Sequence, residues 1–294
     1  MQSERDYAVA NIMKKYIPIV FTSILLMCGC DSTIYRLLYN SLDALVYRSV
    51  TRYINPSPGQ DRFLKEKIDM HLRWHRKVEL PKYIVTLQGL RERMEAGLKK
   101  SDIAWIQGRF DRHEADLYNA ISNDMVNFLV TLDQKQVDQL GRTMGERISE
   151  FEKESRKSAE DRIIETERSY TWFMEFIYGN LSEVQKKDIA RMVRQTEDLE
   201  PVRIRLYRER QAEFIALLRK KPDKDRVRDY VSRLFIHPEK SYPDYYRIPA
   251  ERREQFVIES FLRFDRELLT PAQRLYACKK IDNLIQTIRE LNAE

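Results

Sequence analysis

Apolar residues recur along most of the chain with the spacing of amphipathic helices. Between residues 33 and 54, four of them share one helical face: Leu38, Leu42, Leu45 and Val46. This face predicts core packing, with binding to a membrane surface as the alternative. The same spacing predicts helices over residues 63–80, 82–100 and 101–131, and then over 183–198, 202–219, 223–234, 250–268 and 272–291. Residues 237–249, which contain three tyrosines, are expected to form the longest irregular loop.

The longest predicted helix runs from Asp133 to about Gly179. Its portion between residues 146 and 169 alternates acidic and basic side chains and has few apolar ones. At about 1.5 Å per residue such a helix would extend about 60 Å. It is expected to be either a solvated helix stabilised by charge pairs four residues apart or a binding rim that projects from the fold. The chain as a whole therefore predicts an all-α protein, an elongated multi-helix bundle or cradle.

The N-terminal region contains an uncharged run of twelve residues, Tyr16 to Met27, which follows two lysines. A run of this length fits the apolar region of a signal peptide and is shorter than the ~20 residues that cross a bilayer as a helix. An uncleaved anchor helix or a buried apolar segment is the alternative. Glu4 and Asp6 are atypical before such a region, so we expect translation to begin at Met13.

The run ends in Met27-Cys28-Gly29-Cys30, which resembles a bacterial lipobox. The resemblance implies that residues 1–29 are a signal peptide, and that residues 30–294 form a helical lipoprotein domain with acyl chains on Cys30. Several acyl chains together give stable membrane anchoring. Asp31 resembles the residue that retains lipoproteins in the inner membrane of enteric bacteria. We therefore expect a lipid-anchored, periplasm-facing protein of a Gram-negative cell membrane, at the inner rather than the outer membrane.

Composition agrees with helices that have solvated faces, since 33% of the residues are charged and there are only 8 glycines. The net charge of +6 comes from basic residues interleaved with acidic ones, a pattern that argues against nucleic acid as a partner. Of the three cysteines, Cys28 would leave with the signal peptide and Cys30 would be acylated. Cys278 would then be alone, without an intramolecular disulfide.

Four segments share the pattern of a capping residue followed three positions later by glutamine. They are Ser57 to Gln60, Asp133 to Gln136, Ser182 to Gln185 and Thr270 to Gln273, and the last three follow Leu132, Leu181 and Leu269. The capping side chain can accept from the third backbone N–H of a helix, while the glutamine reaches back to the capping residue. Each segment is therefore predicted to begin a helix.

Leu269-Thr270-Pro271-Ala272-Gln273 resembles the L-T-x-x-Q motif of the periplasmic stress proteins of the Spy and CpxP type, and the other three segments depart from it at the threonine. That family consists of small helical proteins that bind misfolded clients or a sensor kinase.

A second resemblance joins Tyr35-Arg36-Leu37-Leu38-Tyr39-Asn40 to a later motif made of Trp74, His75, Arg76, Glu79, Leu80 and Pro81. These segments are similar to a family of uncharacterised bacterial lipoproteins. The resemblance covers most of the mature chain and implies no activity.

His71, His75 and Glu79 are spaced by four residues, so they stack on one helical face and could hold a metal ion through two imidazoles and a carboxylate. The alternative is that His75 and Trp74 only anchor packing. The spacing also lacks the general base that the H-E-x-x-H motif places between its ligands. His113 has no evident partner in the sequence.

The chain contains no nucleophile elbow, phosphate-binding loop or dinucleotide fingerprint. We therefore expect a non-enzymatic binding or chaperone-like protein without cofactor or nucleotide, whose partner is an unfolded or envelope protein. The alternative is a structural or assembly factor that docks one folded envelope partner, and a metal-dependent enzyme is a third reading. A single large apolar patch would favour the assembly factor, and scattered apolar positions on a concave surface would favour the chaperone.

Overall fold

A computed structural model describes residues 32–236 and 238–293, and the regular structure in this part of the chain is entirely helical, as predicted. The elements are α3 (Ser32–Asn40), α4 (Leu42–Tyr53), α5 (Pro58–Trp74), the π-helix η1 (His75–Glu79), α6 (Leu80–Ala96), α7 (Lys100–Leu129), α8 (Gln134–Ser155), α9 (Ala159–Tyr178), α10 (Glu183–Gln195), α11 (Glu200–Arg219), α12 (Lys224–Phe235), the 3₁₀-helix η2 (Pro238–Ser241), α13 (Asp244–Glu267) and α14 (Pro271–Ala293). None of the helices described is both long enough and apolar enough to span a bilayer. Cys30, Asp31 and the predicted signal peptide lie outside the described residues.

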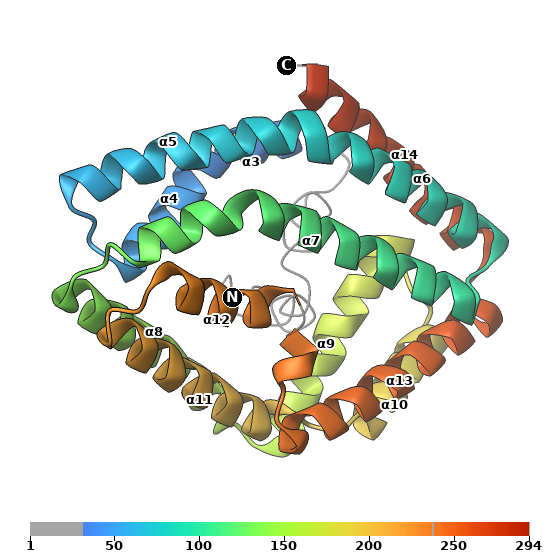
Figure 1. Ribbon diagram of the computed structural model, residues 1–294. Helices are drawn as coiled ribbons and strands as arrows, with labels where there is room; N and C mark the ends of the chain where they lie inside the picture. The colour runs from blue at the N-terminus through green and yellow to red at the C-terminus, as the bar shows by residue number, and fades with distance from the viewer. Residues whose placement is uncertain (1–31, 237, 294) are drawn as a thin grey trace.

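The helices lie along the sides of a four-sided outline (Figure 1). Helices α5, η1 and α6 form one continuous rod along its upper edge, and α6 packs against α14. Helix α8 packs along α11 at the lower left, while α10 and α13 lie together at the lower right. Helix α7 crosses the outline and carries α12. This arrangement leaves long stretches of helix surface open to solvent.

Three apolar clusters hold the helices together. The largest joins α6, α9 and α14 and includes Leu80, Ile288 and Leu291, which are almost completely buried. The second joins α5, α8 and α11 around Val137, and the third joins α7 and α12 around Val126. Because isolated helices are marginal in water, the burial of these apolar faces supplies most of the stability of each helix.

The long helix predicted from Asp133 to Gly179 is wrong, because the chain breaks between Ser155 and Ala159. Ser158 caps α9 by accepting a bond from the backbone N–H of Asp161 at 3.1 Å. The helix predicted over residues 33–54 is also interrupted, at Ser41, between α3 and α4.

The long loop predicted over residues 237–249 is wrong as well. Residues 238–241 form η2, and α13 already begins at Asp244 after its N-cap residue Pro243. Pro249 lies inside α13, where it lacks the N–H that would bond the preceding turn. The helix tolerates this loss within its first two turns, so proline did not mark the helix boundary here. Cys278 is a free, buried thiol, and burial raises its pKa.

Candidate functional site

All four segments with the capping pattern begin helices, and their glutamines make reciprocal bonds to the capping residue. In the first, Gln60 Oε1 accepts from the Ser57 N–H at 2.9 Å while the Gln60 N–H donates to Ser57 Oγ. The equivalent pairs of bonds are present at Asp133 and Gln136, Ser182 and Gln185, and Thr270 and Gln273. Each glutamine still has a side-chain amide group available after these bonds.

The four glutamines use that amide to bind one another in two pairs. In the first glutamine pair, Gln60 Nε2 donates to Gln136 Oε1 at 3.1 Å, and Gln136 Nε2 donates to Gln60 Oε1 at 2.6 Å. Each amide also donates to the backbone before the other motif, at the carbonyls of Thr131 and Asn55. The two helix starts are therefore bonded to each other as well as capped.

The second glutamine pair repeats this arrangement. Gln185 Nε2 donates to Gln273 Oε1 at 2.8 Å, and Gln273 Nε2 donates to Gln185 Oε1 at 3.1 Å. The amides also donate to the carbonyls of Leu268 and Asn180, which precede the opposite motif. Gln136 and Gln185 are buried. Such satisfied buried amides specify one pairing of helices, because any other pairing would leave them without partners.

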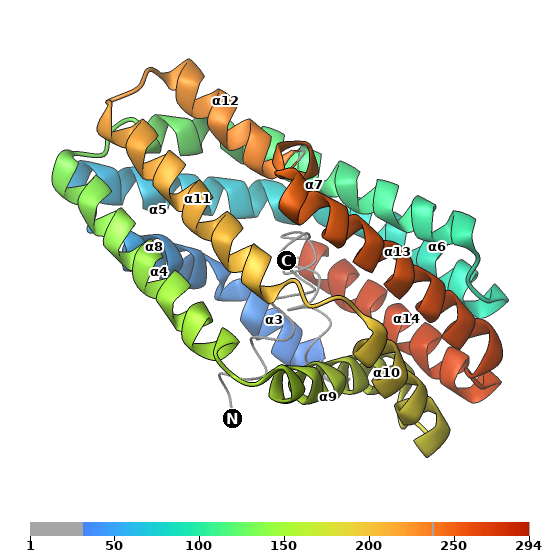
Figure 2. The same cartoon turned by 90° about the horizontal axis from the view of Figure 1, so that it is seen from below.

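The two pairs close equivalent arrangements of four helices. At the first pair, α4 packs on α8 and α5 on α7, and at the second, α9 packs on α14 and α10 on α13. In both cases the helix before one motif contacts the helix after the other. The two pairs lie at opposite ends of the molecule, where Figure 1 and Figure 2 place the α7–α8 turn and the α13–α14 turn.

A buried ion pair further stabilises the α13–α14 turn, beside the second glutamine pair. Asp265 is 2% exposed and accepts two side-chain bonds from Arg274, at 2.8 and 3.0 Å. Asp265 Oδ2 also accepts from the backbone N–H of Leu98 at 3.0 Å. Because Leu98 lies in the turn between α6 and α7, this carboxylate ties the end of the rod to the α13–α14 corner. Neither Asp265 nor Arg274 belongs to a motif that could be recognised in the sequence.

The motif around His75 lies on the π-helix η1, in the middle of the rod. A regular turn would place the ring of Pro81 against the carbonyl of Lys77, and proline has no N–H to bond it. The turn just before Pro81 is wider, because the Leu80 N–H bonds the carbonyl of His75, five residues back, rather than that of Arg76. Trp74, which is partly exposed, precedes η1, and Pro81 is the second residue of α6.

η1 brings the two resembling segments together. His75 Nδ1 lies 2.9 Å from the hydroxyl of Tyr39, and Arg76 donates to Asn40 Oδ1 at 2.6 Å. The Arg76 guanidinium also lies over the Tyr39 ring, 5.1 Å from its centroid. The rod is thus fastened to α3 by residues of both segments.

We call the polar side chains around His75 the buried polar network: Tyr39, His75, Glu79, Tyr83, Thr86 and His113 are buried, and Lys82 contacts them from the exposed surface of α6. His75 Nε2 lies 3.2 Å from the Tyr83 hydroxyl, and His113 Nε2 lies 2.8 Å from Thr86 Oγ1. Burial lowers the pKa of both histidines to about 4, so they are neutral at pH 7. A neutral imidazole has one N–H and one lone pair, so one of the two tyrosine hydroxyls donates to His75 and the other accepts.

Glu79 is the acidic side chain of this network, and it has no solvent-accessible surface. Its Oε1 accepts from Lys82 Nζ at 2.6 Å, and Lys82 also binds Asp116 at 2.8 Å. Its Oε2 has no hydrogen-bond partner among the described residues and lies 3.8 Å from His113 Nδ1. Burial raises the pKa of Glu79, against the opposing effect of Lys82. The network therefore encloses a carboxyl group whose pKa is raised.

His71, His75 and Glu79 do not converge on one point. His71 Nε2 bonds Asp124 at 3.0 Å, His75 bonds two tyrosines, and Glu79 bonds Lys82. Among residues 32–236 and 238–293, no three His, Cys, Asp or Glu side chains are grouped as metal ligands. The two hydroxyls that meet His75 come from Tyr39 on α3 and Tyr83 on α6, and Tyr39, 36 residues away, is too distant in sequence for helical spacing to reveal it.

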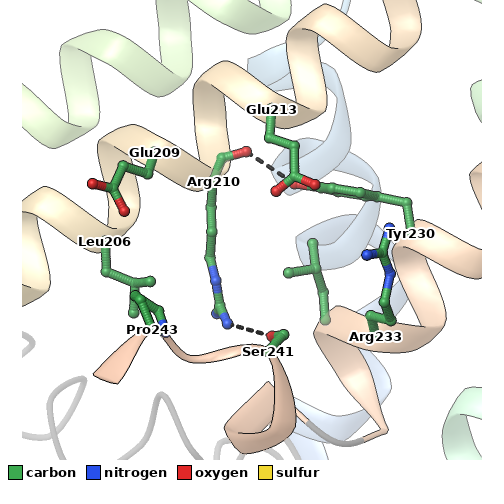
Figure 3. Close-up of a pocket in the computed structure, with 9 residues that line it drawn as sticks. Leu206, Glu209, Arg210, Glu213, Tyr230, Arg233, Ser241 and Pro243 are labelled. Atoms are coloured by element: carbon green, nitrogen blue, oxygen red, sulfur yellow. Dashed lines mark hydrogen bonds between the residues drawn. The ribbon is translucent and has the colours of Figure 1, made fainter. Parts of the chain in front are cut away.

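A shallow pocket of about 180 Å³ lies between α11, α12 and η2 (Figure 3). One of its lining side chains, Arg210, holds η2 in place. Arg210 donates to Ser241 Oγ at 2.8 Å, and the Tyr230 hydroxyl donates to the Arg210 carbonyl at 2.9 Å. Burial raises the pKa of Tyr230 to about 12, so its hydroxyl remains protonated and available as this donor. We therefore interpret the pocket as a gap in the packing between η2 and the two helices.

Comparison with known proteins gives one result. A family model described as "Family of unknown function (DUF6279)" matches residues 52–247, which is more than half of the chain. The match includes the first three helix starts and both histidines of the buried polar network, and it leaves out α3 and α14. No curated protein and no solved structure matches the chain.

Proposed function

The chain belongs to the DUF6279 family of unknown function, and we propose that it is a lipid-anchored envelope protein that binds other proteins without catalysing a reaction. The lipobox-like residues before Cys30 support the anchor. The helix starts of the form L-[TSD]-x-x-Q resemble the motif of periplasmic proteins that bind unfolded clients, and this resemblance supports the binding role.

One surface feature carries the binding proposal. Met70, Val78 and Val85 are 37%, 42% and 53% exposed, and they follow one another along the rod formed by α5, η1 and α6. Met70 and Val78 are eight residues apart, and Val78 and Val85 are seven residues apart. Because the π-turn between them is wider than an α-helical turn, both spacings correspond to about two turns, so the three side chains face the same side of the rod. We call them the rod line.

Charged side chains separate the members of the rod line. Arg73, Lys77 and Lys82 lie on the same side of the rod and are exposed. Isolated apolar groups among charges can contact short apolar segments of an unfolded chain, while the charges keep the protein itself soluble. The other large exposed apolar side chains are also dispersed, over α3, α4, α10, α13 and α14. This dispersion favours many weak client contacts over one docked partner.

Light scattering of an aggregating client tests the proposal, with residues 31–294 added at several ratios and without nucleotide. Suppression at near-equimolar ratio is expected. Removing the rod line (Met70→Gln, Val78→Ser and Val85→Ser) should weaken client binding about 100-fold, since each lost contact costs about 1 kcal/mol. The comparison variant changes Val184 and Leu275, which are 65% and 51% exposed, to Ser and Gln; it should weaken client binding less, because it removes two positions on separate helices rather than three along one rod.

Two results would argue against client binding. If no ratio suppresses aggregation, general client binding fails, and crosslinking in cells to a single envelope protein would then favour the assembly factor. If the rod-line variant and the comparison variant suppress equally, the rod line is not the contact surface.

The anchor has its own test. Mass spectrometry of the protein extracted from membranes should find acyl chains on Cys30 as the first residue of the mature chain. Cys30→Ser should abolish this modification and leave the precursor uncleaved. An unmodified Cys30 would refute the lipoprotein assignment without touching the binding proposal.

A further inference from the structure

The outer face of α3 and α4 points to a second membrane contact beside the lipid anchor. The two helices are nearly continuous, because the Ser41 N–H bonds the Leu37 carbonyl and the Leu45 N–H bonds the Ser41 carbonyl. Residues spaced by three and four along this segment are exposed: Leu37, Ser41, Ala44, Leu45, Arg48 and Arg52. We call this set the α3–α4 stripe.

The stripe combines apolar and basic side chains. Leu37 is 63% exposed and Leu45 is 41% exposed, although apolar positions on the other side of the same helices, such as Tyr39 and Leu42, are buried. No ion pair within residues 32–236 and 238–293 involves Arg48 or Arg52, and both are exposed. The only acidic residue of α4, Asp43, projects from a different side of the helix. An apolar face with arginines and no carboxylate is typical of helices that lie in a bilayer interface.

The position of the stripe in the chain identifies what covers it. Ser32, the first residue of α3, follows Cys30 by two residues, a span of at most about 7 Å. Leu37 is five residues further along a helix that rises about 1.5 Å per residue, so its backbone lies within about 15 Å of the Cys30 backbone. A bilayer that holds acyl chains at Cys30 is therefore within reach of this face.

We propose that the α3–α4 stripe lies on the bilayer surface, with Leu37 and Leu45 among the acyl chains and Arg48 and Arg52 at anionic phospholipid headgroups. This inference rests on the proposed acylation of Cys30. The anchor then restrains one point, and the stripe fixes the orientation of the fold relative to the membrane. Each arginine near an anionic surface is expected to favour the bound orientation about fivefold.

The test uses the acylated mature protein reconstituted into phosphatidylglycerol-containing vesicles that also carry nitroxide-labelled lipids. A fluorophore is attached at Leu37→Cys or Leu45→Cys, with Val184→Cys and Leu275→Cys as equally exposed controls, and the buried Cys278 is unreactive. Quenching at least threefold stronger at positions 37 and 45 than at the controls is expected. It should fall in pure phosphatidylcholine, at high salt, and in the double variant Arg48→Gln and Arg52→Gln.

Each other outcome refutes the inference. Equal quenching at all four positions means that the protein tumbles on its anchor. Crosslinks between labels at position 37 of two molecules, without quenching, mean that a second copy covers the stripe. Protection of position 37 only when other envelope proteins are present means that a protein partner covers it. Mass spectrometry of the same sample reports whether Cys30 is acylated, so a failure of the anchor is seen separately from a failure of the stripe.

Discussion

The first glutamine pair makes a prediction about stability that can be worked out bond by bond. Gln136 takes part in four hydrogen bonds: it accepts from the Asp133 N–H and from Gln60, and it donates to the Asn55 carbonyl and to Gln60. Net contributions of about 0.5–1.5 kcal/mol per bond, reduced where the released partner reaches water, give a loss of about 3 kcal/mol for Gln136→Ala. For a fold of this size the midpoint of thermal unfolding should drop by about 6–12 °C.

The pairing itself is measured by a double-mutant cycle in urea. Gln60→Ala should cost about 2 kcal/mol, because Gln60 is more exposed than Gln136. The double variant should cost about 1–2 kcal/mol less than the sum of the two, since both single changes remove the same pair of bonds between the amides. Circular dichroism at increasing urea concentration gives the three free energies of unfolding.

Two controls accompany the cycle. Gln136→Ala combined with Gln273→Ala should be additive within about 0.5 kcal/mol, because these residues belong to opposite ends of the molecule. Gln286→Ala should change the free energy by less than about 0.5 kcal/mol, since Gln286 only bonds Glu290 on an exposed surface. If Gln60 and Gln136 prove additive within about 0.3 kcal/mol, the two amides are not bonded and the account of the corner is wrong.

Three further changes test other contacts. Acidification from pH 7 to 4 should lower the free energy of unfolding by a few kcal/mol, because burial lowers the pKa of His75 and His113 to about 4, so the unfolded chain binds more protons than the folded chain between about pH 6.5 and 4. In urea titrations at several pH values, His113→Gln should make this loss of stability smaller. Glu79→Gln should make the loss larger, because the raised pKa of Glu79 acts in the opposite direction. Asp265→Ala should cost about 3–5 kcal/mol in urea unfolding, since it leaves Arg274 unpaired, and Asp265→Asn should cost less because it can still accept from Leu98. Gly89→Ala should cost about 1–3 kcal/mol in thermal unfolding, because its Cβ would lie 2.6 Å from the Trp105 ring, whereas Gly108→Ala has open space and should be neutral or stabilising.

Helix starts could be predicted from the sequence because a capping box is local. Ser57 and Gln60 are three residues apart, so the pattern contains the whole interaction. The pairing of Gln60 with Gln136 joins residues 76 positions apart, and nothing within either motif specifies the other. The break before α9 could also have been predicted from the sequence, since Ser158 and Asp161 form a related cap in which aspartate replaces glutamine at the third position.

The buried polar network was only partly predictable. The spacing of His71, His75 and Glu79 indicated one helical face. The π-turn before Pro81 rotates the later residues relative to the earlier ones, so spacing counted along a regular helix no longer gives the partners. His113 and Thr86, which lie on two helices that meet only in the fold, are 27 residues apart and gave no sequence signal.

The membrane contact proposed for the α3–α4 stripe would also determine which side of the molecule faces away from the bilayer. Helix α4 packs on α5 and α8, so the α3–α4 stripe faces away from both of them. In Figure 2, α3 lies on one side of the molecule, and α7 and α12 lie on the opposite side. A bilayer against α3 therefore leaves α12 directed away from that bilayer, together with the exposed basic turn that contains Lys220, Lys221 and Lys224. The same turn also carries the exposed Asp223 and Asp225, so its lysines are interleaved with carboxylates, whereas the α3–α4 stripe contains none. If Cys30 is acylated as proposed, its closeness in the chain to α3 favours the α3–α4 stripe as the side that meets the membrane.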